Sequence, residues 1–127
     1  ASANCQSHQL DNVEIFQSSW FAEITAQRFD LIVSNPPYIE DGDMHLTQGD
    51  VRFEPASALV SGTDGLDDLR LLIAESVNYL VDSGWLMVEH GYNQGPAVRE
   101  LFEQAGFTQV ETRRDLNDLE RITLGCC

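Results

Sequence analysis

The stretch that decides the fold is FDLIVSNPPY, residues 29–38. Its first six residues form an apolar run bounded by polar residues, which predicts a strand buried in a parallel sheet. The strand is followed by Asn35, Pro36, Pro37 and Tyr38, here called the Asn-Pro-Pro-Tyr turn. Open α/β sheets bind ligands just outside the carboxyl ends of their strands, so we expect this turn to lie in a binding site.

The Asn-Pro-Pro-Tyr turn is rich in hydrogen-bond acceptors. The side-chain oxygen of Asn35 and the carbonyls of Asn35 and Pro36 accept hydrogen bonds, while neither proline has an N–H to donate. Such a turn suits a planar NH2 group, whose hydrogens are held by acceptors while its plane stacks on the ring of Tyr38. Fixing that nitrogen in line with an electrophile lowers the barrier by orientation, without a strong base. From the residues alone, a strand end with a packed tyrosine remains the alternative.

The turn resembles motif IV of the amino methyltransferases that use S-adenosylmethionine. Three further segments narrow the resemblance: QGDVRFEP at 48–55, ALV at 58–60 and EHG at 89–91. Together they resemble the HemK/PrmC family, which methylates a glutamine of class 1 peptide release factors. The resemblance covers nearly the whole chain but only the C-terminal portion of the family.

The resemblance implies an α/β, Rossmann-like class I S-adenosylmethionine-dependent methyltransferase fold. Its sheet is expected to be mostly parallel with an antiparallel C-terminal hairpin, and residues 1–127 are expected to be the C-terminal part of a single catalytic domain. In the family, the first strands and the Gly-rich loop that holds part of the S-adenosyl-L-methionine cofactor precede the point where this chain starts. The fold is therefore expected to be truncated.

The resemblance also assigns roles to the Asn-Pro-Pro-Tyr turn. Asn35 and Tyr38 are expected to be catalytic, and all four residues are expected to bind the substrate. Asn35 and the carbonyl of Pro36 would hold the NH2 of the glutamine, Pro37 would shape the turn, and Tyr38 would pack on the amide.

The expected cofactor contacts are Trp20, Ser19 and Asn35. In the resembled family a tryptophan packs near the adenine at the position of Trp20, and an acidic residue usually precedes it where Ser19 stands here. Without the resemblance, a core aromatic would be the alternative for Trp20.

Charge limits the partners of the chain. It carries 21 Asp and Glu against 7 Arg and Lys, all of them arginine, for a net charge of −14. Nucleic-acid binding normally requires cations that neutralise phosphates, so we expect a protein substrate and no direct nucleic-acid binding. A methyltransferase acting on adenine or guanine in DNA or RNA and a non-catalytic binding module remain the alternatives.

Other compositional features predict where the protein acts. No apolar run is long enough to span a membrane, and the three cysteines lack metal-ligand spacing, which favours free thiols in the cytoplasm. Asp41, Asp43 and His45 have no second cluster beside them, so no metal site is expected.

The remaining elements alternate between helix and strand. The predicted loop from 40 to about 65 is interpreted as a lid, with Arg52 and Glu54 as an ion pair or partner contact; a solvated, acidic surface loop is the alternative. His90 is interpreted as a structural histidine. The first strand of the family's sheet, missing here, would leave the 29–34 strand with an open edge, so self-association is expected. The predicted elements are the end of a helix in 1–10, a strand at 13–17, a helix at 67–81 stopped by residues 82–84, a strand at 85–89, a helix from 96 to 106, and strands at 109–112 and 121–124.

Overall fold

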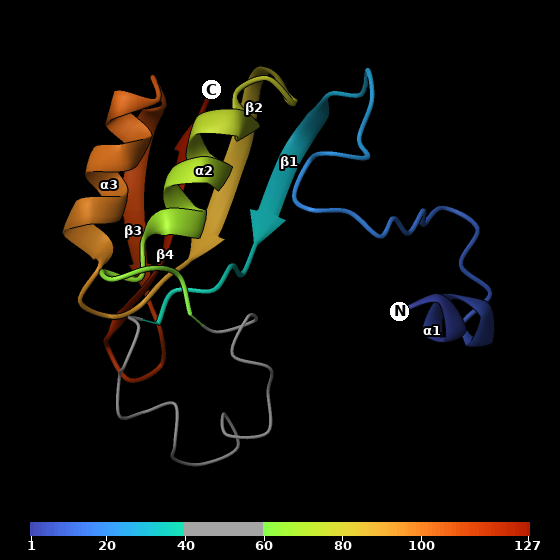
Figure 1. Cartoon of the computed structure of the whole chain (residues 1–127), viewed down its shortest axis with the longest axis horizontal. Coiled ribbons are helices and arrows are strands. Elements are labelled where there is room, and N and C mark those ends of the chain that lie inside the picture. The colour runs from blue at the N-terminus through green and yellow to red at the C-terminus, as the bar shows by residue number, and fades with distance from the viewer. Residues whose placement is uncertain (40–59) are drawn as a thin grey trace.

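The structure is a computed structural model that describes residues 1–39 and 60–127. Two helices and four strands form an α/β unit, and a short N-terminal helix lies apart from it (Figure 1). In chain order the elements are α1 (Ser2–Ser7), β1 (Phe29–Ser34), α2 (Asp67–Ser76), β2 (Leu80–Glu89), α3 (Gly95–Gln104), β3 (Thr108–Arg114) and β4 (Glu120–Cys126).

The four strands form one sheet in the order β1-β2-β4-β3. β1 and β2 are parallel, whereas β4 is antiparallel to both β2 and β3. The predicted antiparallel C-terminal hairpin is therefore confirmed, and within the described residues the sheet is mixed. Parallel pairing of β1 with β2 brings their carboxyl ends, at Ser34 and Glu89, to the same edge of the sheet.

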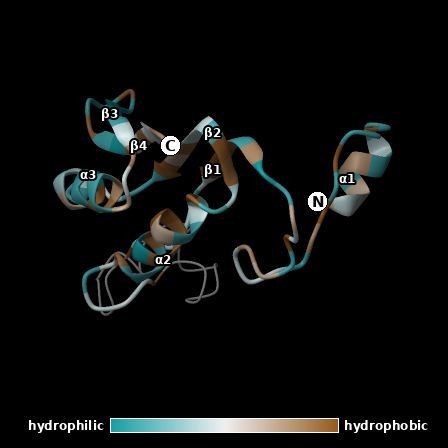
Figure 2. Cartoon of the chain, turned by 90° about the horizontal axis from the view of Figure 1, so that it is seen from above, coloured by the Kyte–Doolittle hydropathy of each residue, from teal (hydrophilic) through white to brown (hydrophobic). Residues whose placement is uncertain are grey.

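Helices α2 and α3 cover one face of the sheet and enclose the core (Figure 2). The close packing of α3 on β4 depends on Gly125, where an added Cβ would lie 2.7 Å from the ring of Phe102. The fully buried side chains of this core are Leu69, Ile73, Leu80, Leu86, Val88, Val98 and Phe102.

The opposite face of the sheet is apolar and open. The strand register places Val33, Met87 and Leu124 in one row across β1, β2 and β4, and the side chain of Val33 is 64% exposed. A shallow hollow of about 320 Å³ lies on this face, lined in part by Leu31 and Trp85. Among the described residues β1 is an edge strand, so its outer backbone groups have no strand neighbour. The prediction that this strand is buried is therefore wrong, because one edge and one face of it have no described partner.

The prediction of a strand at residues 13–17 is wrong. This segment has no regular structure and leads away from the sheet toward α1 (Figure 1). Val13, Ile15 and Phe16 are each between 44% and 52% exposed. Alternating apolar residues favour a strand, but a strand needs a neighbour to satisfy its backbone, and no described segment pairs with this one.

The helix predicted at 67–81 begins at Asp67 as expected but ends at Ser76. Leu80 instead opens β2 and pairs with Phe29, whose N–H donates to the carbonyl of Tyr79 at 2.8 Å. Residues 82–84 therefore lie inside β2, where the register shifts: Phe29 pairs with Leu80, but Leu31 pairs with Trp85. Pairing with β1 overrides the local turn signal.

Several other predictions are confirmed with small shifts in their bounds. A helix occupies residues 2–7, Pro96 lies in the first turn of α3, and the last two predicted strands are longer than expected, as β3 and β4.

Within residues 1–39 and 60–127, no helix has the length and apolar character needed to cross a bilayer. The three cysteines are free thiols.

Candidate functional site

The Asn-Pro-Pro-Tyr turn lies at the carboxyl edge of the sheet, directly after β1. Asn35 is exposed, Pro36 is buried, and Pro37 and Tyr38 are half-buried. The buried proline anchors the turn while the acceptor groups of Asn35 remain accessible to a ligand. Ile39, the next residue, forms an isolated parallel bridge with Val60.

The ring of Tyr38 is fixed by the end of β2. Its hydroxyl donates to Oε1 of Glu89 at 3.1 Å. Burial raises the pKa of the Tyr38 phenol, and the charge and hydrogen bond of Glu89 raise this pKa further. The phenol is therefore a neutral donor, and the ring is held beside the carboxyl ends of two parallel strands.

The backbone of Tyr38 is held by a residue that the sequence prediction missed. The side-chain Nε2 of Gln94 donates to the carbonyl of Tyr38 at 3.0 Å. Two prolines in the turn remove two backbone donors, so the turn cannot hold itself by its own N–H groups alone. The sequence signal was weak: Gln94 follows Gly91 and precedes Gly95, but nothing local connects it to a residue 56 positions away.

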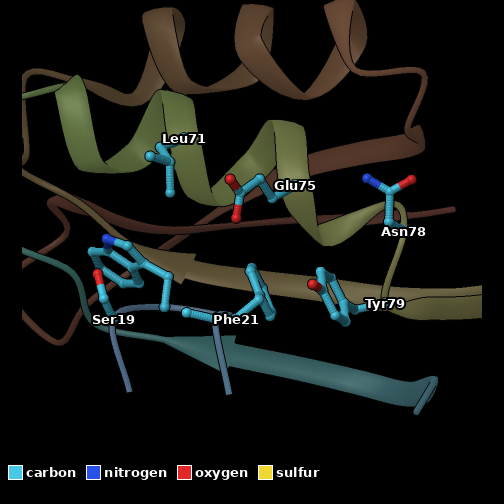
Figure 3. Close-up of a pocket in the computed structure, with 8 residues that line it drawn as sticks. Ser19, Phe21, Leu71, Glu75, Asn78 and Tyr79 are labelled. Atoms are coloured by element: carbon cyan, nitrogen blue, oxygen red, sulfur yellow. The ribbon is translucent and has the colours of Figure 1, made fainter. Parts of the chain in front are cut away.

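A second hollow, of about 550 Å³, lies beside Trp20. Figure 3 shows Ser19 and Phe21 on one side of it, with Leu71 and Glu75 of α2 on the other. The ring of Phe21 stacks on that of Tyr79, with centroids 4.4 Å apart and an interplanar angle of 10°. The hollow thus combines aromatic surface with polar groups.

Trp20 takes a backbone conformation that is uncommon for its residue type. Its φ is +50°, in the left-handed region that few residues other than glycine adopt. Ser19 and Trp20 line the same hollow, as the predicted cofactor contacts require, whereas Asn35 is not among the residues that line it. The structure therefore places the turn and the Trp20 hollow as two separate features.

His90 belongs to a buried chain of hydrogen bonds, as expected of a structural histidine. Its Nδ1 lies 2.8 Å from the carbonyl of Gly91 and its Nε2 lies 2.9 Å from Thr123 Oγ1. Thr123 in turn contacts Thr112, which accepts from Arg99. Because the carbonyl of Gly91 can only accept, Nδ1 of the neutral ring carries the hydrogen and Nε2 accepts from the hydroxyl of Thr123. The hydroxyl of Thr123 in turn accepts from that of Thr112. Burial is the main reason that the pKa of His90 is lowered, so the ring is neutral.

Some predicted features lie outside the described residues. These are the 48–55 segment with Arg52 and Glu54, most of the 58–60 segment, and the rejected metal cluster at Asp41, Asp43 and His45. Where the structure does describe the chain, no three His, Cys, Asp or Glu side chains gather as a metal site would require.

Comparison with known proteins gives a consistent result. The family described as "Methyltransferase small domain" matches residues 1–65. The chain is 56% identical over 125 residues to the release factor glutamine methyltransferase of Pseudomonas aeruginosa, covering 98% of this chain and 45% of that protein. It is 51% identical over 127 residues to the protein of the same name from Xylella fastidiosa, covering all of this chain and 46% of that protein. The chain thus spans about half the length of these curated relatives.

A solved structure shares the fold. It is the protein-(glutamine-N5) methyltransferase (release factor-specific) from Alicyclobacillus acidocaldarius, with a TM-score of 0.50 and 26% sequence identity. The match covers 80% of this chain and 50% of that one. The fold is therefore that of a truncated class I methyltransferase, with the mixed sheet described above.

Proposed function

Because the chain belongs to the methyltransferase small domain family, we propose that it is the C-terminal part of a single catalytic domain that methylates N5 of a glutamine. The proposed substrate is a class 1 peptide release factor. The similarity to release factor glutamine methyltransferases supports this substrate. The single observation that carries the chemistry is the accessible Asn35, which lies next to a buried proline at the carboxyl edge of two parallel strands.

The proposed mechanism is positioning of a weak nucleophile. The side-chain oxygen of Asn35 and the carbonyl of Pro36 accept the two hydrogens of the glutamine NH2, and the ring of Tyr38 packs on the amide plane. The hydrogen bond from Tyr38 to Glu89 keeps that ring in place. Orientation lowers the barrier, and the amide proton leaves after the nitrogen has been alkylated, so no general base is needed at the start.

The proposed cofactor is S-adenosyl-L-methionine, which supplies an electrophilic methyl group when bound. The residues present fit its adenine: the Trp20 hollow offers an aromatic plane, and Glu75 and Asn78 in its lining offer polar groups for a purine. Trp20 and Ser19 are the proposed adenine contacts. Asn35, which lies outside that hollow, is the proposed contact at the reacting end.

The proposed partner is a protein and not a nucleic acid. The net charge of −14 repels phosphate backbones and is compatible with a basic protein surface. A reducing, cytoplasmic location is proposed because all three cysteines are free thiols.

A second copy of the chain is the proposed occupant of the open edge of β1. Antiparallel pairing about a two-fold axis at Ile32 would set Leu31 of one copy opposite Val33 of the other. The same register sets Asp30 opposite Ser34, so no two carboxylates face each other. The exposure of Leu31 and Val33, at 51% and 64%, supports this pairing.

The methylation proposal is tested by joining this chain to the part of the Pseudomonas aeruginosa relative that it does not cover. Replacing Asn35 by alanine in this chimera is expected to lower kcat about 100-fold or more, as removal of a positioned hydrogen-bonding group does in other enzymes. The matched control is Asn12→Ala, which truncates an exposed asparagine outside the site. A rate for Asn35→Ala near that of the control would show that the role assigned to Asn35 is wrong.

A further inference from the structure

The amide of Gln94 connects three segments that are distant in sequence. Its Oε1 accepts from the N–H of Gly91 at 2.8 Å. Its Nε2 donates to the carbonyls of Tyr38 and Asp64, at 3.0 and 3.3 Å. These contacts, here called the Gln94 network, join the Asn-Pro-Pro-Tyr turn, the chain before α2 and the turn after β2.

The Gln94 network is a buried and fully paired arrangement. Gln94 is 7% exposed, and both of its amide hydrogens and its oxygen have partners. A buried amide that lost these partners would leave donors and acceptors without water to replace them. The side chain therefore has one favourable orientation, which fixes the distance between its partners.

Two glycines provide the space that the network needs. An added Cβ at Gly65 would lie 2.4 Å from the carbonyl oxygen of Tyr38 and 2.7 Å from Nε2 of Gln94. An added Cβ at Gly91 would lie 3.0 Å from Oε1 of Gln94. Any side chain at these positions would push the amide away from the turn.

We propose that Gln94 is a positioning residue that sets the place of the Asn-Pro-Pro-Tyr turn, and thereby of the acceptors on Asn35 and Pro36. The catalytic consequence rests on the proposed function, whereas the positioning itself does not. The turn needs an external donor because Pro36 and Pro37 have no N–H. Gln94 supplies that donor to the carbonyl of Tyr38, the last residue of the turn and three residues after Asn35.

The proposal is tested first on this chain without any substrate. Gln94→Met keeps the approximate shape of the side chain but has no N–H donor. We expect it to shift the NMR signals of the Asn35 side-chain NH2 and the Tyr38 backbone amide, and to speed exchange of the Gly91 amide hydrogen about 10-fold or more. The control is Gln104→Met, the same change at the exposed last residue of α3, where the side-chain amide of Gln104 donates to Glu100 at 3.0 Å.

Gly91→Ala is the second variant, to be used if Gln94→Met does not fold. Its added Cβ displaces Oε1 of Gln94 while the amide itself is kept. The same shifts at Asn35 and Tyr38 are expected. The comparison is made in whichever of the two variants folds. If its Asn35 and Tyr38 signals match those of the Gln104→Met control, the proposal is overturned.

The catalytic consequence is measured in the chimera described above. Gln94→Met is expected to lower kcat/KM for the release factor about 10-fold or more while the KM for S-adenosylmethionine stays unchanged. Phe102→Leu, a core change remote from the turn, controls for lost stability and is expected to change neither constant. If Gln94→Met shifts the NMR signals but the unmodified chimera transfers no methyl group, the proposed function fails and the positioning role stands.

Discussion

Replacing Gly65 by alanine is expected to destabilise the protein by two separable effects. The φ of Gly65 is +69°, a left-handed conformation that costs a residue with a Cβ about 1–2 kcal/mol. The new Cβ would also lie 2.4 Å from the backbone oxygen of Tyr38. Relieving that overlap means moving the turn or the Gln94 amide, and overpacking of this kind costs about 1–3 kcal/mol. The sum is about 2–5 kcal/mol.

Gly106→Ala separates the two effects. Gly106 also has a positive φ, of +93°, but an added Cβ would meet nothing within 4 Å. The gain from a less flexible unfolded chain is the same for both substitutions. We therefore expect Gly65→Ala to lower the free energy of unfolding about 1–3 kcal/mol more than Gly106→Ala does.

The assay is urea unfolding of the two variants and the unmodified chain, followed by tryptophan fluorescence and circular dichroism. The difference in midpoint at equal slope gives the difference in stability. If Gly65→Ala lowers the free energy of unfolding no more than Gly106→Ala does, the close approach of Gly65, Tyr38 and Gln94 is not present in solution. The turn would then not be held by this packing.

Three further predictions follow from the same structure. The free energy of unfolding, measured by urea titration, should fall as the pH drops from about 7 to about 5.5. The reason is that the pKa of buried His90 is below the ordinary 6.5, so the unfolded chain takes up a proton at a higher pH than the folded chain does. His90→Gln should flatten this fall. Thr123→Val should lower the free energy of unfolding by about 1–3 kcal/mol, because it leaves Nε2 of His90 buried without its donor. An equal loss of stability from Thr108→Val, at an exposed threonine, would contradict this. Val33→Lys should shift the chain toward monomer in size-exclusion chromatography while Leu116→Lys, in an exposed turn, does not; a monomeric profile of the unmodified chain would count against self-association.

Features coded by local sequence could be predicted well. The apolar run at 29–34 became β1, a parallel strand as predicted but at the edge of the sheet and not buried. The Asn-Pro-Pro-Tyr turn lies at its carboxyl end as expected. Pro96 placed the start of α3 within one residue. His90 was correctly interpreted as structural, because a histidine at the end of a buried strand needs partners, and the structure supplies two.

Features that depend on distant partners could not be predicted. Residues 13–17 alternate between apolar and polar side chains as a strand does, but no described segment pairs with them. The apolar spacing of the predicted 67–81 helix includes Leu80, which serves equally well as the first buried residue of β2. The same limit hid the hydrogen bonds that join Gln94 and Glu89 to Tyr38, across 56 and 51 residues. No local pattern reports contacts at that separation.

We propose that the Asn-Pro-Pro-Tyr turn of this chain holds a glutamine amide for methylation. The most direct measurement is mass spectrometry of a class 1 release factor after incubation with the chimera and S-adenosylmethionine. We expect one added methyl group, located on a glutamine side chain and lost with Asn35→Ala but not with Asn12→Ala. An unmodified release factor, under conditions where the intact Pseudomonas aeruginosa relative methylates it and the chimera is folded, would contradict the claim.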